Sequence, residues 1–600
     1  YLYLACGREA HYQYDKRGDK SQPEDTILFS RIDKETGKPV AFEGETRPFV
    51  PLTTVEPMTG LPYESYGEIV ERGAFRAEIM AGRVKGLAVG PARAFIASYF
   101  EDEVLVVDKS TGKLLNRFSV PRPAGLEWIS PDELLVVSAE EKKVLRMDPD
   151  TGETSPVVNS GLEAPMDLAV DADGNIFVSD WGRAMCVKVF SREGTFLHAV
   201  GKEGGRAWIG SFDPSGMLNP FGIDIDSRGR LWVVEFDGLP RRISVWGADG
   251  AFEKEFIAAG SYAGSICWIL PDQPERTIAS GGVFELDWDR GQYRLLETLW
   301  RPVHRDAHFG PYQDAHTRHQ VTINGRSLLV SQTGKSFVAI SEQKGDRHQP
   351  LAAMGQVAGL FASTRGKYGQ LHVTGLRYLT VPTWIRDHLY WSDEVNQYIA
   401  ENHPEAFDGT FYPSRVIWWN KGDYFSRTGV KSEHGAPSPT TNFTWSDRNG
   451  DGLVQQEEVT YFEVPGMGPT GFEGGQTVGV APDLTIYQKS MDGGFNVWKL
   501  PVVDWTESGA PVYDGPNAEL IIQDPDHGIS NSLWADSRGN LLSNSTGGMM
   551  MFSPDGNLLW RYPNPFAGVH ASHNATRSDR GMLIGPLFVI GSLQVEGLGE

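Results

Sequence analysis

The sequence predicts an all-β fold made of repeated small antiparallel sheets. Two stretches, Pro165–Asp180 and Pro220–Glu235, share an alternating strand, a D-x-x-G turn, a second apolar strand and a final acidic residue. Each continues into a third strand, at 187–190 and 243–246, and a further glycine turn. Repetition of such strands at a period of about 50 residues indicates the blades of a β-propeller. We expect seven or eight blades with loop insertions; two smaller rings are the alternative.

Both stretches fit the pattern P-x-x-[LI]-x-[VI]-D-x-x-G-x-[IL]-x-V-x-[DE]. In this pattern the chain resembles the NHL-repeat family of propellers, over these two units, and the resemblance becomes weaker on either side. The glycine supplies the positive φ of the tight turn, and the aspartate side chain closes the turn on its own backbone. The resemblance implies one blade for each unit.

A second turn, D-x-x-T-G, occurs at 33–37, 108–112 and 148–152. Three copies of one hairpin turn support repeated blades from the beginning of the chain onward. The pattern is lost between 350 and 440, where a long irregular segment is typical of an insertion. The predicted organisation is a strand pair with a loop-rich segment at 1–83, NHL-like blades at 84–345, an irregular aromatic-rich insertion at 346–475, and the last blades with ring closure at 476–600.

The composition excludes some classes of partner. The 55 Lys and Arg residues against 78 Asp and Glu give a net charge of −23, which argues against nucleic acid or an anionic membrane surface. The sequence contains no apolar run of about 18 residues, so it predicts no transmembrane segment. Cys186 and Cys267 lie in apolar strand patterns, which favours buried free thiols, with a disulfide as the alternative. The three cysteines, Cys6 included, form no C-x-x-C motif. Both ends of the sequence look cut from a longer polypeptide.

The most specific motif is S-D-R-N-G-D-G-L-V-Q-Q-E-E, which fits D-x-[DN]-x-[DN]-G-x₅-E. It resembles an EF-hand calcium loop, in which oxygen ligands alternate along twelve residues and the last glutamate binds through both oxygens. The flanks T-N-F-T-W and V-T-Y-F-E-V predict strands rather than helices, so we expect a structural Ca²⁺ site, with an unoccupied acidic turn as the alternative. The predicted ligands are Asp447, Asn449, Asp451, the Leu453 carbonyl, Gln455 and Glu458.

A second candidate site is the segment from His304 to His319, which holds four of the 14 histidines of the chain. It could be a transition-metal site for Zn²⁺, Mn²⁺ or Fe²⁺. It could also be a metal-free acid–base site in which histidine is the base, tyrosine the acid, and arginine neutralises a substrate carboxylate, as β-elimination requires. A polar loop with backbone-bonded histidines is the third interpretation. The candidate residues are His304, Arg305, His308, Tyr312, His316, Arg318 and His319, and ring closure could bring His570 and His573 near them.

Two functions follow from these features. The first is a segment of a large secreted or cell-surface propeller protein that binds a protein or glycan partner and holds a structural calcium ion. Aromatic residues crowded between Trp384 and Trp445 offer faces for sugar rings, although a buried core is the commoner use of such residues. The alternative is an extracellular enzyme, either a polysaccharide lyase or a metal-dependent lyase or hydrolase, that uses the His304–His319 segment. The NHL-type propellers include a metal-dependent lyase with histidine ligands, and none of its ligands can be carried over to this sequence.

Overall fold

The computed structural model of the chain is an all-β structure that consists of small antiparallel sheets. Among the described residues the one helical element is the short 3₁₀ turn Gly515–Asn517. The structure describes residues 1–8, 25–46, 48–55, 84–181, 183–206, 210–235, 241–258, 268–270, 273–279, 281–299, 315–323, 325–333, 337–355, 359–362, 371–376, 441–452, 458–465, 478–490, 495–524, 530–545 and 548–562.

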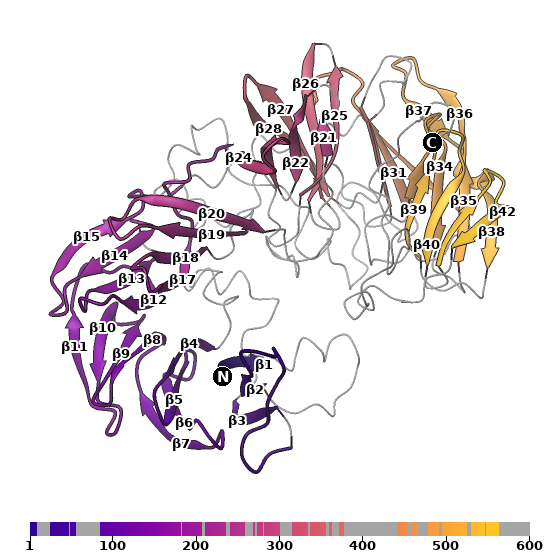
Figure 1. Cartoon of the computed structure of the whole chain (residues 1–600). Helices are drawn as coiled ribbons and strands as arrows, with labels where there is room; N and C mark the ends of the chain where they lie inside the picture. Colours follow the sequence, from indigo (N-terminus) through magenta and orange to yellow (C-terminus); the bar gives the residue numbers. More distant parts are fainter. Residues whose placement is uncertain are drawn as a thin grey trace. The chain divides into compact units, whose positions relative to one another are not determined.

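The chain divides into two compact units, and the described part of unit 1 is Tyr1–Ala258. Its sheets follow the chain in the orders β1-β2-β3, β4 to β7, β8 to β11, β12 to β15 and β17 to β20 (Figure 1). The strand bounds are β1 Leu2–Arg8, β2 Asp25–Ile32, β3 Phe49–Val55, β4 Val84–Val89, β5 Arg93–Ser98, β6 Glu103–Asp108, β7 Leu114–Ser119, β8 Pro123–Ser130, β9 Glu133–Ser138, β10 Lys143–Met147, β11 Thr154–Val158, β12 Pro165–Val170, β13 Ile176–Asp180, β14 Cys186–Phe190, β15 Phe196–Val200, β16 Gly210–Ser211, β17 Pro220–Ile225, β18 Leu231–Glu235, β19 Arg241–Trp246 and β20 Phe252–Ala258.

Unit 2 contains the described residues that follow Ala258. Its sheets are β21 to β24, β25 to β28, β29 to β32, β33-β34-β35-β38 and β39 to β42, with a separate hairpin of β36 and β37. The strand bounds are β21 Trp268–Leu270, β22 Gln273–Ala279, β23 Gly282–Asp287, β24 Gln292–Thr298, β25 Ala315–Ile323, β26 Arg326–Thr333, β27 Phe337–Lys344, β28 Arg347–Gly355, β29 Gly359–Ala362, β30 Leu371–Leu376, β31 Thr441–Ser446, β32 Val459–Glu463, β33 Val478–Val480, β34 Ile486–Ser490, β35 Phe495–Leu500, β36 Val502–Trp505, β37 Pro511–Tyr513, β38 Glu519–Asp524, β39 Ser530–Ala535, β40 Leu541–Ser545, β41 Gly548–Phe552 and β42 Leu558–Tyr562.

The predicted turns close the hairpins of these sheets. Asp171 Oδ1 accepts the backbone N–H groups of Asp173 and Asn175 at 2.9 and 2.8 Å, and Gly174 has a φ of +85°. The D-x-x-T-G turns use the same device, because Asp108 accepts backbone and hydroxyl hydrogens of Ser110 and Thr111. These hydrogen bonds, chiefly that from the Ser110 hydroxyl, lower the pKa of Asp108 to about 2. Local turn chemistry therefore sets the strand spacing.

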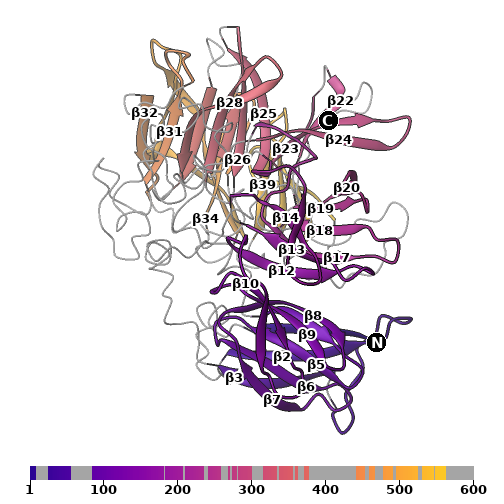
Figure 2. The same cartoon turned by 90° about the vertical axis from the view of Figure 1, so that its left-hand side faces the viewer.

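Successive sheets pack through their first strands. In unit 1, β4 lies against β1 and β8, and β12 lies against β8 and β17. The two views agree in placing β8 beside the sheet of β4 to β7 (Figures 1 and 2). Within unit 2, β29 contacts β25 and β33, and β33 contacts β39. Adjacent first strands in consecutive four-stranded sheets are the arrangement of a propeller, so the chain is all-β and propeller-like.

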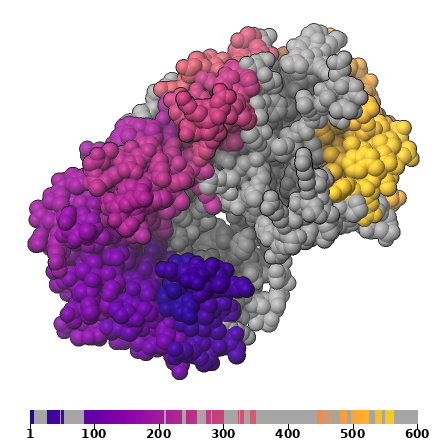
Figure 3. All heavy atoms as spheres, in the orientation of Figure 1, coloured from indigo at the N-terminus to yellow at the C-terminus, as the bar shows by residue number. Residues whose placement is uncertain are grey.

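Apolar side chains fill the space between neighbouring sheets. In β5, Phe95 and Ala97 belong to a buried cluster with residues of β9, whereas Ala94 and Ile96 pack with residues of β2. Alternate residues of one strand therefore face two different sheets, as the period of two along a strand requires. On the face in view in Figure 3, the purple atoms of β4 to β15 form a continuous body.

Several sequence expectations can be compared with this architecture. The described residues form ten sheets of three or more strands, and the predicted number of seven or eight blades stays a prediction, as do the domain boundaries. Strands β29 and β30 lie in the predicted irregular segment and pair with β31 and β32 in a further four-stranded sheet. Cys186 is a buried free thiol and Cys6 an exposed one, while Cys267 lies outside the described residues. In the described part, no helix is long and apolar enough to cross a membrane.

Candidate functional site

The predicted calcium loop connects two neighbouring strands. β31 and β32 pair antiparallel, with Trp445 opposite Val459 and Thr444 opposite Thr460. The strands predicted on both sides of the motif are thereby confirmed. The loop from Asp447 to Glu458 is thus a hairpin connection, and both of its ends are fixed by the sheet.

Two carboxylates lie inside this hairpin. The Asp447 side chain is fully buried, and its Oδ2 accepts the Gly452 N–H at 3.0 Å. Glu458 is 5 % exposed; its Oε1 accepts the Arg448 N–H at 2.7 Å and its Oε2 the Trp445 Nε1–H at 2.9 Å. Asp447 Oδ1 is buried and has no hydrogen-bond partner. A buried carboxylate oxygen without a partner is energetically costly, and a native structure normally compensates it with a donor or a cation.

The pKa values of the two buried carboxyl groups of the loop, Asp447 and Glu458, are both raised. Burial, followed by the charge of Glu458, raises the pKa of Asp447 to about 6. Burial also raises the pKa of Glu458, against the hydrogen bonds from Trp445 and Arg448. Both carboxyls thus hold their protons more tightly than in water. A cation at this place would favour their ionised forms.

The other predicted ligands lie at the loop surface or outside the described residues. Asp451 N–H bonds to Asn449 Oδ1 at 2.9 Å, and Asn449 Nδ2 donates to Asp451 Oδ2 at 3.1 Å. Leu453 and Gln455 lie outside the described residues. Within the described ranges, no three His, Cys, Asp or Glu side chains are gathered closely enough to hold a metal ion. Asp447, Asp451 and Glu458 therefore do not converge on one point in this conformation.

A second acidic feature, which the sequence analysis missed, lies on the first strands of unit 1. The third residue is glycine in β4, β8 and β17, but Asp167 in β12. Asp167 Oδ2 accepts the Ile223 N–H of β17 at 3.0 Å. A Cβ added to Gly125 of β8 would lie 2.4 Å from Asp167 Oδ1. The carboxyl therefore occupies the space that glycine leaves between neighbouring first strands.

The pKa values of Asp167 and of Glu127, which lies in β8, are both raised toward neutral pH. Burial raises the pKa of Asp167 to about 7, and the charge of Glu127 adds to the effect. Burial and the charge of Asp224 raise the pKa of Glu127 to about 7. The first strands β8, β12 and β17 thus bring together three acidic side chains, two of which can bind or release protons near pH 7. The signal in the sequence was aspartate at a position where the other repeats have glycine.

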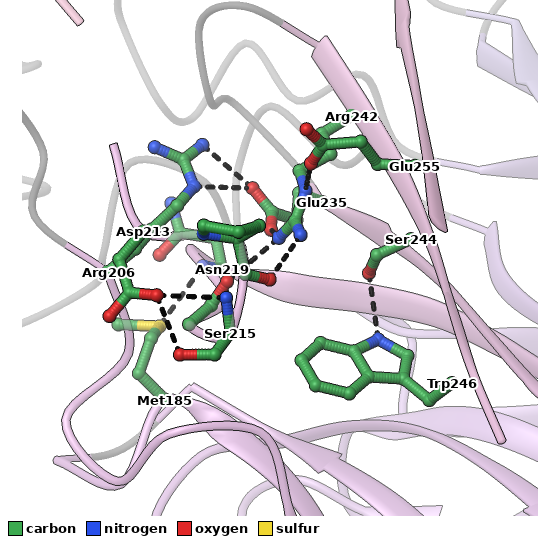
Figure 4. Close-up of polar contacts among 12 residues, drawn as sticks. Met185, Arg206, Asp213, Ser215, Asn219, Glu235, Arg242, Ser244, Trp246 and Glu255 are labelled. Carbon is green, nitrogen blue, oxygen red and sulfur yellow. Dashed lines mark hydrogen bonds and ion pairs between the residues drawn. The ribbon is translucent and has the colours of Figure 1, made fainter. Parts of the chain in front are cut away.

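The acidic residue that ends each of the two repeated units, 165–180 and 220–235, is a buried structural group. Asp180 accepts the Ala164 N–H at 2.6 Å and pairs with Lys188 at 2.7 Å. The equivalent Glu235 lies between two arginines of unit 1, as Figure 4 shows. Its Oε2 accepts Nε and NH2 of Arg206 at 3.0 and 2.7 Å, and its Oε1 accepts NH1 of Arg242 at 2.7 Å. These ion pairs fix the ends of the strands, and those of Glu235 are closed to solvent.

The histidine segment is described only in part. His304, His308 and Tyr312 lie outside the described residues, and so do His570 and His573. His316, Arg318 and His319 belong to the strand β25, which begins at Ala315. The backbone pairs His316 with Gln332 and His319 with Val330. The transition-metal, acid–base and polar-loop interpretations, and with them the enzyme alternative, stay predictions.

A different histidine has a carboxylate partner that the sequence did not indicate. His348 Nδ1 lies 2.9 Å from Glu297 Oε2, and the His348 N–H donates to Glu297 Oε1 at 2.7 Å. Glu297 is in β24 and His348 in β28, so this pair joins the last strands of two sheets of unit 2. Nε2 of His348 is buried without a hydrogen-bond partner. Because this atom is closed to solvent, we interpret the His348–Glu297 pair as a structural link between the two sheets.

Comparison with known proteins adds little to this description. No protein-family model matches the chain, and no curated protein matches it. Among solved structures, that of a streptogramin B lyase is similar, with a TM-score of 0.24 and 12% identity, over 48% of this chain and 90% of that one. At these values the similarity carries no information on activity, and the fold assignment rests on the sheets and their packing.

Proposed function

We propose that this chain is a calcium-stabilised, propeller-like binding protein in which the EF-hand-like loop 447–458 holds one Ca²⁺ ion. The observation that carries the proposal is Asp447, whose carboxylate is fully buried while its Oδ1 has no hydrogen-bond partner. Glu458, the last predicted ligand, is buried in the same hairpin. A divalent cation would compensate both charges in a place where water cannot.

The loop chemistry favours Ca²⁺ over other cations. Its ligands are oxygens at positions 1, 3, 5, 7, 9 and 12, and hard oxygen ligands in this number suit Ca²⁺. Gly452, at position 6, has a φ of +71° and donates its N–H to Asp447. Asn449 and Asp451 would exchange their mutual hydrogen bond for the ion. When bound, Ca²⁺ supplies positive charge that links the two ends of the loop.

The paired strands on both sides make a structural role the natural one. Flanking strands in a sheet cannot swing apart as the helices of a calcium sensor do. In this proposal the chain is a secreted or cell-surface segment, and the propeller-like body presents loops to a protein or glycan partner. An acidic chain with net charge −23 and a structural calcium site are consistent with an extracellular module.

The test is calcium-dependent thermal unfolding of the dialysed protein, together with calorimetric titration of Ca²⁺. We expect the midpoint temperature to rise with Ca²⁺, because an ion at 100 times its dissociation constant stabilises the folded state by about 2.7 kcal/mol. Glu458→Gln and Asp447→Asn should abolish this rise. The readout is the shift upon Ca²⁺ addition, since Asp447→Asn also removes a buried charge and can stabilise the metal-free protein.

The matched control is Asp171→Asn, in another Asp-Gly turn. Both oxygens of Asp171 are already used, by the N–H groups of Asp173 and Asn175 and by the Asn175 side chain. This variant should keep the full calcium response. Absence of any Ca²⁺ heat and an unchanged midpoint in the parent protein would refute the proposal, and an equal response to Mg²⁺ would refute its assignment to Ca²⁺.

A further inference from the structure

The calcium loop rests on the neighbouring sheet of unit 2. A Cβ added at Gly452 would lie 2.6 Å from Leu351 Cδ2 and 3.3 Å from Leu328 Cδ1. Both leucines are buried, and they belong to β28 and β26 of the sheet β25 to β28. The turn of the loop, which is part of the sheet β29 to β32, therefore packs backbone-first onto another sheet.

Arg326, the first residue of β26, connects the two sheets by hydrogen bonds. Its Nε and NH2 donate to the two oxygens of Glu342, both at 2.8 Å, and its NH1 donates to the Asp451 carbonyl at 2.5 Å. Glu342 also accepts Lys344 Nζ at 2.7 Å. A two-pronged arginine–carboxylate pair has a fixed orientation, so Glu342 aims the remaining N–H of Arg326 at the loop.

The Asp451 carbonyl oxygen, which accepts the hydrogen bond from Arg326, is not one of the predicted calcium ligands. In the predicted ligand set, position 5 contributes the Asp451 side chain, and the backbone carbonyl comes from position 7. Arg326 can therefore keep its bond to the Asp451 carbonyl while the Asp451 carboxylate turns toward the ion. The same contact limits the positions that this part of the loop can adopt before the ion arrives.

We propose that Arg326, oriented by Glu342, is a positioning residue of the calcium site, so that Ca²⁺ affinity depends on the contact between the loop and the sheet β25 to β28. This inference rests on the proposed function. Because linkage is reciprocal, Ca²⁺ binding tightens the junction of the two sheets by the same factor by which the junction tightens Ca²⁺ binding. The site thus fastens two neighbouring sheets as well as closing one hairpin.

Two substitutions separate positioning from simple charge. Arg326→Gln removes a positive charge near the site; if only charge mattered, Ca²⁺ would bind more tightly. Arg326→Lys keeps the charge but loses the planar fork; if only charge mattered, affinity would not change. Under the proposal both variants bind Ca²⁺ more weakly, by about tenfold, the effect of losing one hydrogen bond to a charged group.

The experiment is calorimetric titration of CaCl₂ into the full chain, with circular dichroism to verify the fold of each variant. Arg294→Gln and Arg294→Lys are the controls, because Arg294 also pairs with a glutamate, donating Nε and NH2 to Glu285 Oε2 at 3.2 and 2.8 Å in the sheet β21 to β24. Both should bind Ca²⁺ like the parent. Hydrogen exchange gives a second readout: Ca²⁺ should slow exchange in β26 and β27 of the parent and of the Arg294 variants, but less in the Arg326 variants.

The outcomes are distinguishable from failure of the calcium site itself. If the parent protein binds no Ca²⁺, the proposed function fails and this inference fails with it. If the parent binds Ca²⁺ and Arg326→Gln binds it equally or more tightly, the calcium site stands and the positioning role is refuted. If Arg326→Gln binds Ca²⁺ more weakly and Arg326→Lys binds it as the parent does, a single donor is sufficient and the orientation of Arg326 by Glu342 is refuted.

Discussion

Glu235 provides the most direct test of how the repeated unit is held together. Glu235→Gln keeps the size of the side chain and removes its charge from between Arg206 and Arg242 (Figure 4). The side chains of Arg206 and Arg242 are 1% and 0% exposed, and that of Glu235 is fully buried. Arg206 and Arg242 would then lose the negative charge that they share, in a place that solvent cannot reach.

The structure limits the size of the effect. Two unit charges about 4 Å apart interact by about 4 kcal/mol at an effective dielectric constant of about 20, and breaking one partner out of a buried ion pair costs about 3–5 kcal/mol. Arg242 retains Glu255 and the carbonyls of Pro214 and Gly216, which reduces the loss. We therefore expect local destabilisation of about 3 kcal/mol, at the lower end of the range for a broken buried pair.

A local assay is required, because unfolding in one step is not expected of a chain with two compact units. Hydrogen exchange of peptides covering β17 to β19 reports the free energy of opening this sheet. A loss of about 3 kcal/mol corresponds to opening about 100 times more often. The control is Glu285→Gln, whose partner Arg294 is 69% exposed; surface pairs of this kind contribute less than about 1 kcal/mol. Equal exchange in Glu235→Gln and the parent would refute the reasoning.

Two further predictions concern the first strands of unit 1. Burial raises the pKa of Asp167 from 3.8 to about 7, so the stability that protonated Asp167 contributes is complete below pH 3.8 and is lost as the pH rises through 7. Asp167→Asn should flatten this decline and gain at most about 4 kcal/mol in the free energy of unfolding above pH 7. Identical pH profiles of stability in the variant and the parent, measured by hydrogen exchange, would contradict this prediction. Gly125→Ala would place a Cβ 2.6 Å from the Asp167 Cα and should cost about 1–3 kcal/mol, whereas Gly222→Ala, whose nearest neighbour would be 3.9 Å away, should be tolerated. Similar losses in both variants, measured by hydrogen exchange of peptides covering β8, β12 and β17, would refute the steric argument.

The sequence by itself determined the features that depend on neighbours along the chain. The Asp-Gly turns at Asp108 and Asp171 form from residues within four positions, so their spacing predicts the hairpins. The EF-hand-like motif is equally local, since its predicted ligands span twelve consecutive residues. Alternating apolar residues then predict strands with one buried face and continuous apolar runs predict strands with two, which is why the all-β fold could be predicted from the pattern.

The tertiary structure decided which distant residues meet. Stacking of sheets brings Asp167 to the Ile223 N–H, and Arg206 to Glu235, although neither pair shares a turn. It also brings Arg326 to the Asp451 carbonyl across 125 positions. The strands β29 and β30 were missed because no D-x-x-G or D-x-x-T-G turn joins them. Local hydrogen bonds fix turns and hairpins, whereas contacts between sheets depend on the packing of whole faces, which no short pattern encodes.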